Sequence, residues 1–90
     1  MNSSMKKSLT SAQIRAARAL IRWSAEDLAR SSSVGLTTIR RAELTIEETS
    51  LTAANNLAIR SALESAGVEF IDENGGGPGV RLRKPTRQKR

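Results

Sequence analysis

Three segments in the first half of the chain carry apolar residues at helical spacing, and they predict helices over residues 11–21, 25–31 and 36–43. In each segment the apolar residues recur at intervals close to a helical turn, so they gather on one stripe of the helix surface. The other positions are mostly polar or charged, which indicates helices that cover a core on one side. The residues expected to be buried are Ile14, Ala17, Leu20 and Ile21 in the first helix, Leu28 and Ala29 in the second, and Ile39 and Ala42 in the third.

The three helices share one kind of start signal. Thr10 and Ser24 occupy N-cap positions, and Gln13 and Asp27 follow three residues later, which is the spacing of a capping box. Gly35 occupies the N-cap position of the third helix. An apolar residue directly before each cap is matched by another five residues later, as in a hydrophobic staple, and these pairs are Leu9 with Ile14, Trp23 with Leu28, and Val34 with Ile39.

The second and third helices are separated by only about four residues, Ser32 to Gly35. Two short helices so closely joined must cross steeply, which predicts a helix-turn-helix. Trp23, just before the second helix, is expected to plug the space between the first two helices rather than to stack on a base.

The second half of the chain predicts a fourth helix and then a β-hairpin. The helix spans about residues 52–66, with Gly67 suited to the position after its end and with Ile59, Ala62, Leu63 and Ala66 facing inward. Asn55 and Asn56 are unusual on its inner side, and they indicate either a frayed first turn or a polar contact between subunits. Residues 68–71 and 80–83 then alternate with period two, so that one hairpin face carries Val68, Phe70, Val80 and Leu82.

The loop between the two predicted strands is rich in glycine. It lacks the Lys-Ser/Thr pair of a phosphate-binding P-loop and does not lead from a strand into a helix, so we interpret it as a hairpin turn. The expected organisation is a flexible N-terminus over residues 1–9, a helical domain over 10–66, a hairpin extension over 67–83 and a disordered basic tail over 84–90.

Composition narrows the possible chemistry. Histidine and cysteine are absent from the 90 residues, which removes imidazole bases, thiolate nucleophiles, disulfides and nearly all zinc sites. The adjacent Glu47 and Glu48 fall on a predicted linker, where they are expected to be solvated rather than catalytic. We therefore expect no enzyme activity, no metal and no cofactor. No segment approaches the roughly 20 apolar residues of a membrane span, so we expect a cytoplasmic protein.

The net charge of +6 is unevenly distributed. Residues 1–43 hold eight Lys or Arg and three Asp or Glu, residues 44–80 hold one base and six acids, and residues 81–90 hold six bases and no acid. A basic first half and a basic end favour a polyanionic partner, most commonly nucleic acid. Charge alone is equally compatible with a solvated basic surface.

The segment WSAEDLARSSSVGLTTIRRAE, residues 23–43, resembles the Cro/repressor-type (XRE) helix-turn-helix family, and the resemblance covers residues 10–66. The matching features are the Leu28–Ala29 pair, Val34 in the turn, Ile39 in the third helix and the closing Glu43. The resemblance implies a mainly α, four- to five-helix repressor-like DNA-binding domain. The hairpin looks like a C-terminal extension seen on many short bacterial members.

In that family the third helix enters the major groove of double-stranded DNA. By position, the resemblance assigns base contacts to Leu36, Thr37 and Arg41, and backbone contacts to Thr38 and Arg40. Arg22, on the basic face of the first helix, is a further candidate for DNA binding. The resemblance also implies an ion pair between a first-helix arginine and the closing glutamate, here Arg18 and Glu43, with DNA contact by Arg18 as the alternative.

Three positions depart from the family pattern. Ser33 stands where the turn usually has glycine, and a left-handed conformation there costs about 1 kcal/mol. Ala25 replaces a glutamine that touches phosphate, and Leu36 replaces a polar residue on the reading surface. These departures favour a protein with few base contacts that relies on phosphates and DNA shape, or else a surface that faces a protein partner.

The sequence thus predicts a transcriptional regulator, expected to be a repressor, that binds operator DNA as a homodimer through the fourth helix or the hairpin edge. The alternatives are a protein-interaction module or an antitoxin-type partner of another protein on the same scaffold, and an RNA-binding protein that uses its basic tail.

Overall fold

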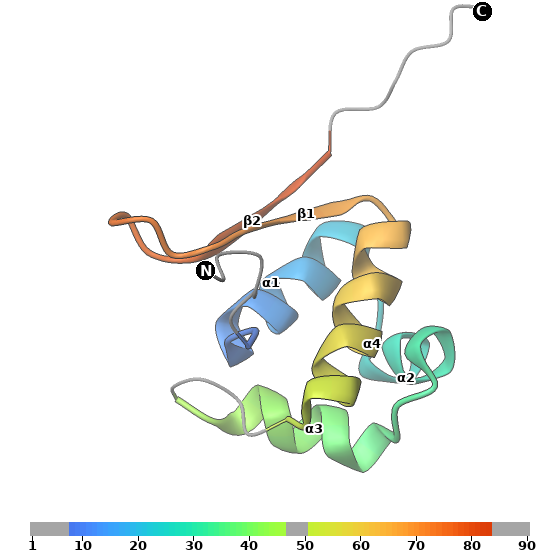
Figure 1. Ribbon diagram of the computed structural model, residues 1–90. Coiled ribbons are helices and arrows are strands. Elements are labelled where there is room, and N and C mark those ends of the chain that lie inside the picture. Colours follow the sequence, from blue (N-terminus) through green and yellow to red (C-terminus); the bar gives the residue numbers. More distant parts are fainter. Residues whose placement is uncertain (1–7, 47–50, 84–90) are drawn as a thin grey trace, which may run out of the picture.

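Four helices followed by a two-stranded antiparallel hairpin make up the structure, a computed structural model that describes residues 8–46 and 51–83 (Figure 1). The elements are α1 (Ser11–Ile21), α2 (Ala25–Ser32), α3 (Leu36–Leu44), α4 (Ala53–Ser65), β1 (Val68–Ile71) and β2 (Gly79–Leu82). The mainly helical class and the C-terminal hairpin are therefore confirmed, with β2 one residue earlier than expected. The predictions for residues 1–7, for the Glu47–Glu48 pair and for the tail 84–90 lie outside the described residues.

The capping boxes predicted for the first two helices are present. Thr10 Oγ1 accepts a hydrogen bond from the Gln13 N–H, and Gln13 Oε1 accepts one from the Thr10 N–H, each at 3.0 Å. Ser24 and Asp27 form the same reciprocal pair at 2.9 and 3.0 Å. These bonds satisfy backbone donors that a helix leaves unpaired in its first turn. They explain why the positions where α1 and α2 begin are readable from sequence.

Eleven apolar side chains, contributed by all four helices, by β1 and by the residues next to them, form one core among the described residues. They are Leu9, Ile14, Ala17, Ala25, Leu28, Val34, Ile39, Ala42, Ile59, Leu63 and Val68. The prediction that Leu20 is buried is wrong, because its side chain is 38% exposed. Leu20 lies about 120° around the helix from Ile14, at the margin of the apolar stripe. The narrower stripe of Ile14, Ala17 and Ile21 faces the core.

The hairpin packs against α1 and α4. Val68 pairs with Leu82 and Phe70 with Val80, so the four residues share one face as predicted. Val68 is fully buried and Phe70 and Val80 are partly buried, whereas Leu82, the partner of Val68, is 51% exposed. The hairpin thus extends the helical core and does not stand apart from it.

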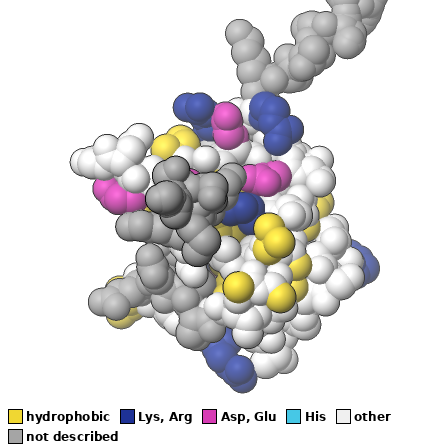
Figure 2. All heavy atoms as spheres, viewed as in Figure 1, with side chains coloured by type: hydrophobic (Ala, Val, Ile, Leu, Met, Phe, Trp, Pro, Cys, Tyr) yellow, Lys and Arg dark blue, Asp and Glu magenta, His cyan; other side chains and the backbone are white. Residues whose placement is uncertain are grey.

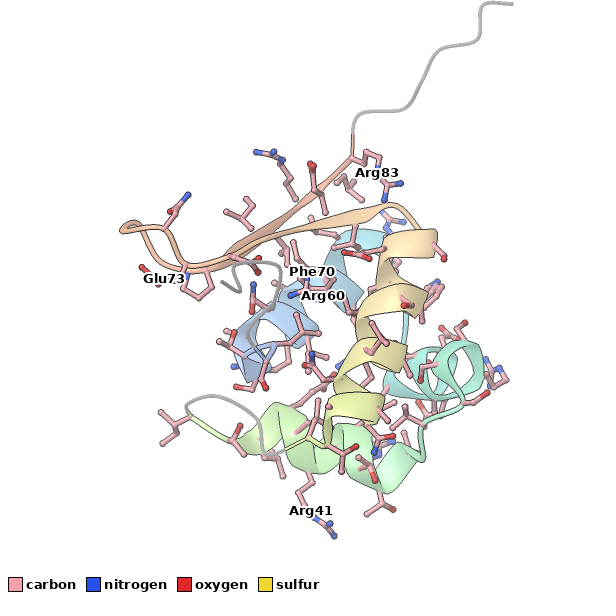
Figure 3. The ribbon with its side chains drawn as sticks, in the orientation of Figure 1. Arg41, Arg60, Phe70, Glu73 and Arg83 are labelled. Carbon is pink, nitrogen blue, oxygen red and sulfur yellow. The ribbon has the colours of Figure 1, made fainter. Side chains whose placement is uncertain are left out.

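Two polar side chains fasten this hairpin to the helices. Gln13 Nε2 of α1 donates to the carbonyl oxygens of Ile71 and Gly79, at 3.3 and 3.1 Å, and so contacts both strands at one paired position. Arg60 of α4 is only 4% exposed, and its guanidinium carbon lies 5.0 Å from the centre of the Phe70 ring (Figure 3). Its ion pairs with Asp72 and Glu64 are long, at 3.4 and 3.6 Å.

Of the two alternatives for the asparagines of α4, the frayed first turn is wrong, and the contact between subunits stays a prediction. Asn56 Oδ1 accepts a hydrogen bond from the Leu9 N–H at 2.9 Å, which holds the segment before α1 against α4. The Asn55 N–H donates to Thr52 Oγ1 at 3.1 Å, so the first turn of α4 is capped. Asn56 therefore makes a contact within the chain, and the first turn is not frayed.

None of the helices in the described part of the chain combines the length and the apolar character that crossing a membrane requires.

Candidate nucleic-acid interface

The α3 helix lies at one end of the molecule, opposite the hairpin, with α2 beside it (Figure 1). The turn between α2 and α3 is residues 33–35, and Ser33 adopts the left-handed conformation at φ +62°. Val34 is buried under this turn, and Ile39 and Ala42 bury the inner side of α3. The opposite side of α3 is therefore exposed along its length.

The two adjacent arginines of α3 have different surroundings. Arg40 Nη2 donates to Glu26 Oε2 of α2 at 2.9 Å, and both side chains are about half exposed. Arg41 is exposed and makes no ion pair with any residue in 8–46 or 51–83. It projects away from the end of the molecule (Figure 3). Arg41 is thus available to an external partner, while Arg40 is partly neutralised by Glu26.

The other expected contact residues of α3 divide between surface and core. Thr37 is exposed, and Thr38 is partly buried. Leu36 is partly buried and packs against the core. The apolar residue that seemed out of place on a reading surface thus has a packing role.

A shallow recess of about 210 Å³ lies between α3 and the start of α4. Thr38, Arg41 and Ala42 line it from α3, and Leu51, Thr52 and Asn55 line it from the other side. The first N–H groups of a helix carry partial positive charge. Beside Arg41, this recess therefore presents positive potential to an anion such as a phosphate. The sequence interpretation missed Thr52 and Asn55 as residues of this surface.

The ion pair expected between Arg18 and Glu43 is present in the structure. Arg18 Nε and Nη2 donate to the two carboxylate oxygens of Glu43 at 2.7 and 2.8 Å, and Nη1 donates to the Trp23 carbonyl oxygen at 2.8 Å. The hydrogen bond to Glu43 raises the pKa of Arg18 above its ordinary value, against the opposing effect of burial. The guanidinium is therefore occupied within the fold, where it fixes the end of α3 against α1.

Arg22 is not brought together with the residues of α3. It is the C-cap of α1, with φ +59°, and α1 ends on the hairpin side of the molecule (Figure 1). Arg15 lies closer to α3, because it lines a recess of about 240 Å³ together with Arg40, Glu43 and Leu44. Arg15 and Arg22 lie on the same basic face of α1. The spacing of the arginines identified this face, but it did not show that Arg15 is the residue nearer α3.

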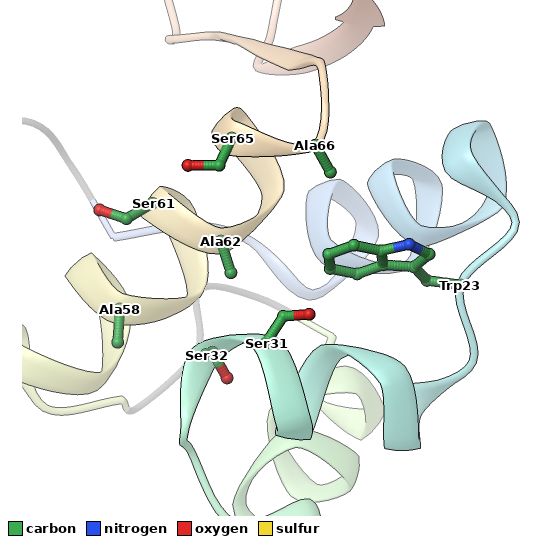
Figure 4. A pocket seen from close by; sticks show the side chains of 8 residues that line it. All are labelled: Trp23, Ser31, Ser32, Ala58, Ser61, Ala62, Ser65 and Ala66. Carbon is green, nitrogen blue, oxygen red and sulfur yellow. The ribbon is translucent and has the colours of Figure 1, made fainter.

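Trp23 is partly buried and packs against the core. It stands at one end of a groove of about 460 Å³ between α2 and α4, whose other walls are small Ser and Ala side chains (Figure 4). The plug between α1 and α2 stays a prediction, and the structure shows that the ring also lines the α2–α4 groove.

The backbone N–H groups of the glycine-rich loop bind side chains of the same loop. Glu73 Oε2 accepts hydrogen bonds from the N–H groups of Gly75 and Gly77 at 3.0 and 3.1 Å, and Asn74 Oδ1 accepts one from Gly76 at 3.3 Å. Gly75 and Gly77 have positive φ, which favours glycine. The N–H groups that a phosphate would use already bind the Glu73 carboxylate or the Asn74 amide oxygen, in agreement with a hairpin turn.

The part of the chain that the structure describes contains no group of three or more carboxylates placed to share a metal ion. No protein family matches the chain, and no curated protein matches it in sequence. Function is therefore inferred from the residues and their geometry.

Proposed function

We propose that the chain is a DNA-binding transcriptional regulator, acting as a repressor, of the Cro/repressor-type (XRE) helix-turn-helix family. The observation that carries this proposal is the exposed α3. Glu43 fixes its end to the fold, and Arg41, which has no ion pair among residues 8–46 and 51–83, projects away from the molecule. A rigid short helix with one free arginine on its outer side suits insertion into the major groove.

The residues of α3 divide the work of recognition. Arg41 is the base reader, because a guanidinium can bind the O6 and N7 atoms of guanine together, which is worth about 1–3 kcal/mol of discrimination. Thr37 contacts a phosphate or a thymine methyl group. Arg40 contributes to phosphate binding while it exchanges with Glu26, and the recess beside Thr52 receives a phosphate at the start of α4.

A homodimer supplies the second half of the contacts. One domain with a single free arginine on α3 makes few base contacts, whereas a two-fold pair reads two half-sites about one helical turn apart. Leu57, on the outer side of α4, is 62% exposed. Leu82 on the hairpin is also exposed, at 51%, so α4 and the hairpin edge each offer an apolar residue for the surface between the two copies.

The second candidate function is a protein-interaction module, including an antitoxin-type partner of another protein. The groove between α2 and α4 favours it, since Trp23 and small side chains offer a partly apolar depression away from the exposed side of α3 (Figure 4). If the chain is such a module, any binding of the protein to DNA should show no preference for sequence.

The test is selection of preferred sequences from a pool of random duplexes, followed by a salt titration on the selected duplex. A regulator enriches a short motif, and its affinity falls linearly with salt on a log–log plot. Arg41→Ala should relax the preference at one position of the motif and weaken binding to the selected duplex by about 10- to 100-fold.

Arg30→Ala is the matched control, because it removes one exposed arginine that is paired with Asp27 on α2. It should leave the enriched motif unchanged. A wild-type protein that enriches no motif, or that binds duplexes independently of salt, would overturn the proposal in favour of the protein-interaction module.

A further inference from the structure

The outer side of α3 carries one large apolar residue that the proposed function leaves without a role. Leu44, the last residue of α3, is 81% exposed and is not among the apolar residues of the described chain that pack against the core. It follows Thr37 by seven positions and Arg41 by three, so the three side chains lie along one stripe of the helix. Ile39 and Ala42 occupy the opposite, buried side. Leu44 therefore faces the same way as the arginine that we assign to base reading.

Basic residues lie on both sides of this stripe. Because each residue turns a helix by about 100°, Arg40 and Arg41 fall on opposite sides of its midline. On the first side, Arg15 of α1 joins Arg40 in lining the recess of about 240 Å³, where the Glu43 carboxylate is already bound within the fold. Arg15 is exposed and makes no ion pair within residues 8–46 and 51–83. On the second side, Arg41 lines the recess of about 210 Å³ at the start of α4.

This arrangement of charge matches the major groove of a duplex. Figure 2 shows that the acidic side chains of the visible face gather toward the hairpin, while the basic side chain at the α3 end stands apart from them. The major groove is about 12 Å wide, admits one helix and is bordered by two rows of phosphates. With a phosphate row at each basic edge of α3, the stripe between the edges faces the bases.

A second copy of the chain fits this surface less well. A two-fold contact through Leu44 would bring Arg15 and Arg40 close to the same two residues of the other copy, because they line the recess that Leu44 also lines. Like charges placed opposite each other oppose association. The charge around Leu44 thus favours DNA over self-association as the group that covers it.

We propose that Leu44 is a specificity-determining residue that packs against the C5-methyl group of a thymine in the major groove. This inference deepens the proposed function and rests on it. A leucine side chain forms no hydrogen bond, and the methyl group of thymine is the apolar group on the major-groove edge of the base pairs. Their contact removes from water the apolar surface that Leu44 otherwise exposes. Leu44 lies about 10 Å further along the helix than Thr37, so the two residues meet different base pairs.

The experiment uses the full chain and the motif that selection from random duplexes enriches. Each thymine of the motif is replaced in turn by deoxyuridine, which lacks the methyl group and keeps the hydrogen bonds of the base pair. Fluorescence anisotropy at one salt concentration gives the affinity of every duplex for wild type, Leu44→Ala, Leu44→Met and Leu57→Ala. Leu57→Ala is the matched control, because Leu57 is an exposed leucine of α4 that lines neither basic recess.

At one thymine, removal of the methyl group should weaken binding of the wild-type protein by about three- to fivefold. In Leu44→Ala the same removal should change affinity by at most about 1.5-fold, because the partner of the methyl group is already missing. Leu44→Met keeps an apolar side chain of similar volume and should retain the wild-type loss. Leu57→Ala should retain it too, whatever its overall affinity. A purely structural role for Leu44 would weaken thymine and uracil duplexes alike.

The inference is overturned if, at every thymine, the loss in Leu44→Ala agrees with the loss in wild type to within about twofold. If Leu44→Ala then weakens all duplexes equally, Leu44 belongs to an interface between copies or with another protein. An enriched motif without thymine also overturns the inference. In these cases the Arg41→Ala result still decides the proposed function, because it concerns a different base pair. A selection that enriches no motif overturns both.

Discussion

Arg18 and Glu43 form a two-point ion pair in which both carboxylate oxygens of the glutamate accept hydrogen bonds from one guanidinium. The pair connects the last turn of α1 to the last turn of α3, and the side chains are 22% and 10% exposed, respectively. The third donor of the guanidinium holds the Trp23 carbonyl oxygen at the entrance to α2. One side chain thus fixes three helices relative to each other, including α3, which we propose enters the major groove.

The first prediction is that Glu43→Gln lowers the free energy of unfolding by about 2–3 kcal/mol, because it leaves the mostly buried Arg18 charge without its partner. Urea denaturation followed by the fluorescence of Trp23 measures it. Glu26→Gln is the control, since it breaks an exposed pair with Arg40 and should cost at most about 1 kcal/mol. Equal losses in the two variants would contradict a structural role for Arg18.

Glu26→Gln has a second expected effect, on DNA binding. The change frees Arg40 to bind a phosphate, so duplexes of all sequences should bind more tightly, with a log–log salt slope steeper by about 0.9. Fluorescence anisotropy with selected and unrelated duplexes measures both slopes. Glu69→Gln is the control, because it removes the same charge at the hairpin end, and it should leave the salt slope unchanged. If Glu26→Gln leaves the salt slope unchanged, Arg40 does not contact DNA.

Ser33→Gly should stabilise the protein. Ser33 has φ +62°, a conformation in which a Cβ atom is strained and glycine is not. Glycine relieves that strain, but it also gives the unfolded chain more conformational freedom. The net effect should be an increase of about 0.5–1 kcal/mol in the free energy of unfolding. Ser33→Ala keeps the Cβ atom and should give no gain. The melting temperatures of the three proteins measure the effect. A lower melting temperature in Ser33→Gly would show that the Ser33 hydroxyl group stabilises the turn more than its backbone conformation destabilises it.

The capping box of α2 predicts a pH dependence. Hydrogen bonds from the backbone N–H and the hydroxyl of Ser24 hold the pKa of Asp27 below its ordinary value of 3.8. A lowered pKa means that the unfolded chain takes up the proton first, so this stabilisation is complete above about pH 4 and is lost as the pH falls through the folded-state pKa. The wild-type protein should therefore melt at a higher temperature than Asp27→Asn near neutral pH, and this difference should decrease below about pH 4.

A double-mutant comparison checks the cause of this effect. Ser24→Ala removes the hydroxyl partner of Asp27 and should cost about 1 kcal/mol at pH 7. Adding Asp27→Asn to that variant should then change its acid sensitivity less than it does in the wild-type background. If the two changes act independently at every pH, the Ser24 hydroxyl does not contribute to the lowered pKa of Asp27, and the Ser24 backbone N–H alone accounts for it.

The last prediction concerns Arg60. Its guanidinium makes long ion pairs, its Nε atom forms no hydrogen bond within the described residues, and its ring contact with Phe70 is a packing contact. Arg60→Met should therefore stay within about 1 kcal/mol of wild type, while Arg60→Ala should lose about 2–4 kcal/mol through missing volume. Urea unfolding gives both values. A large loss in Arg60→Met would instead assign the stabilisation to charge.

Local signals in the sequence were sufficient for the helix starts and for the hairpin. Capping residues act on a backbone three positions away, so Thr10 and Ser24 mark α1 and α2 without reference to the rest of the fold. Strand alternation likewise determines which residues share a face, as for Phe70 and Val80. The Arg18–Glu43 contact was expected only because the segment resembles a known family.

Contacts between distant segments were not predictable. The burial of Arg60 depends on where Phe70 and Asp72 are placed by the hairpin, and nothing in the spacing of α4 reveals that position. The Glu26–Arg40 pair depends on the crossing of α2 and α3. Leu20 was misassigned because helical periodicity defines the centre of an apolar stripe better than its edges.

Gln13 joins the start of α1 to both strands through a single side chain, and this has a consequence for how the protein folds. Its carbonyl oxygen accepts from the N-cap while its amide nitrogen donates to Ile71 and Gly79, nearly sixty residues or more further along the chain. Because fraying at either place deprives the other of a partner, we expect the first turn of α1 and the hairpin to lose their protection from hydrogen exchange together. The beginning and the end of the described chain are thereby coupled into one cooperative unit.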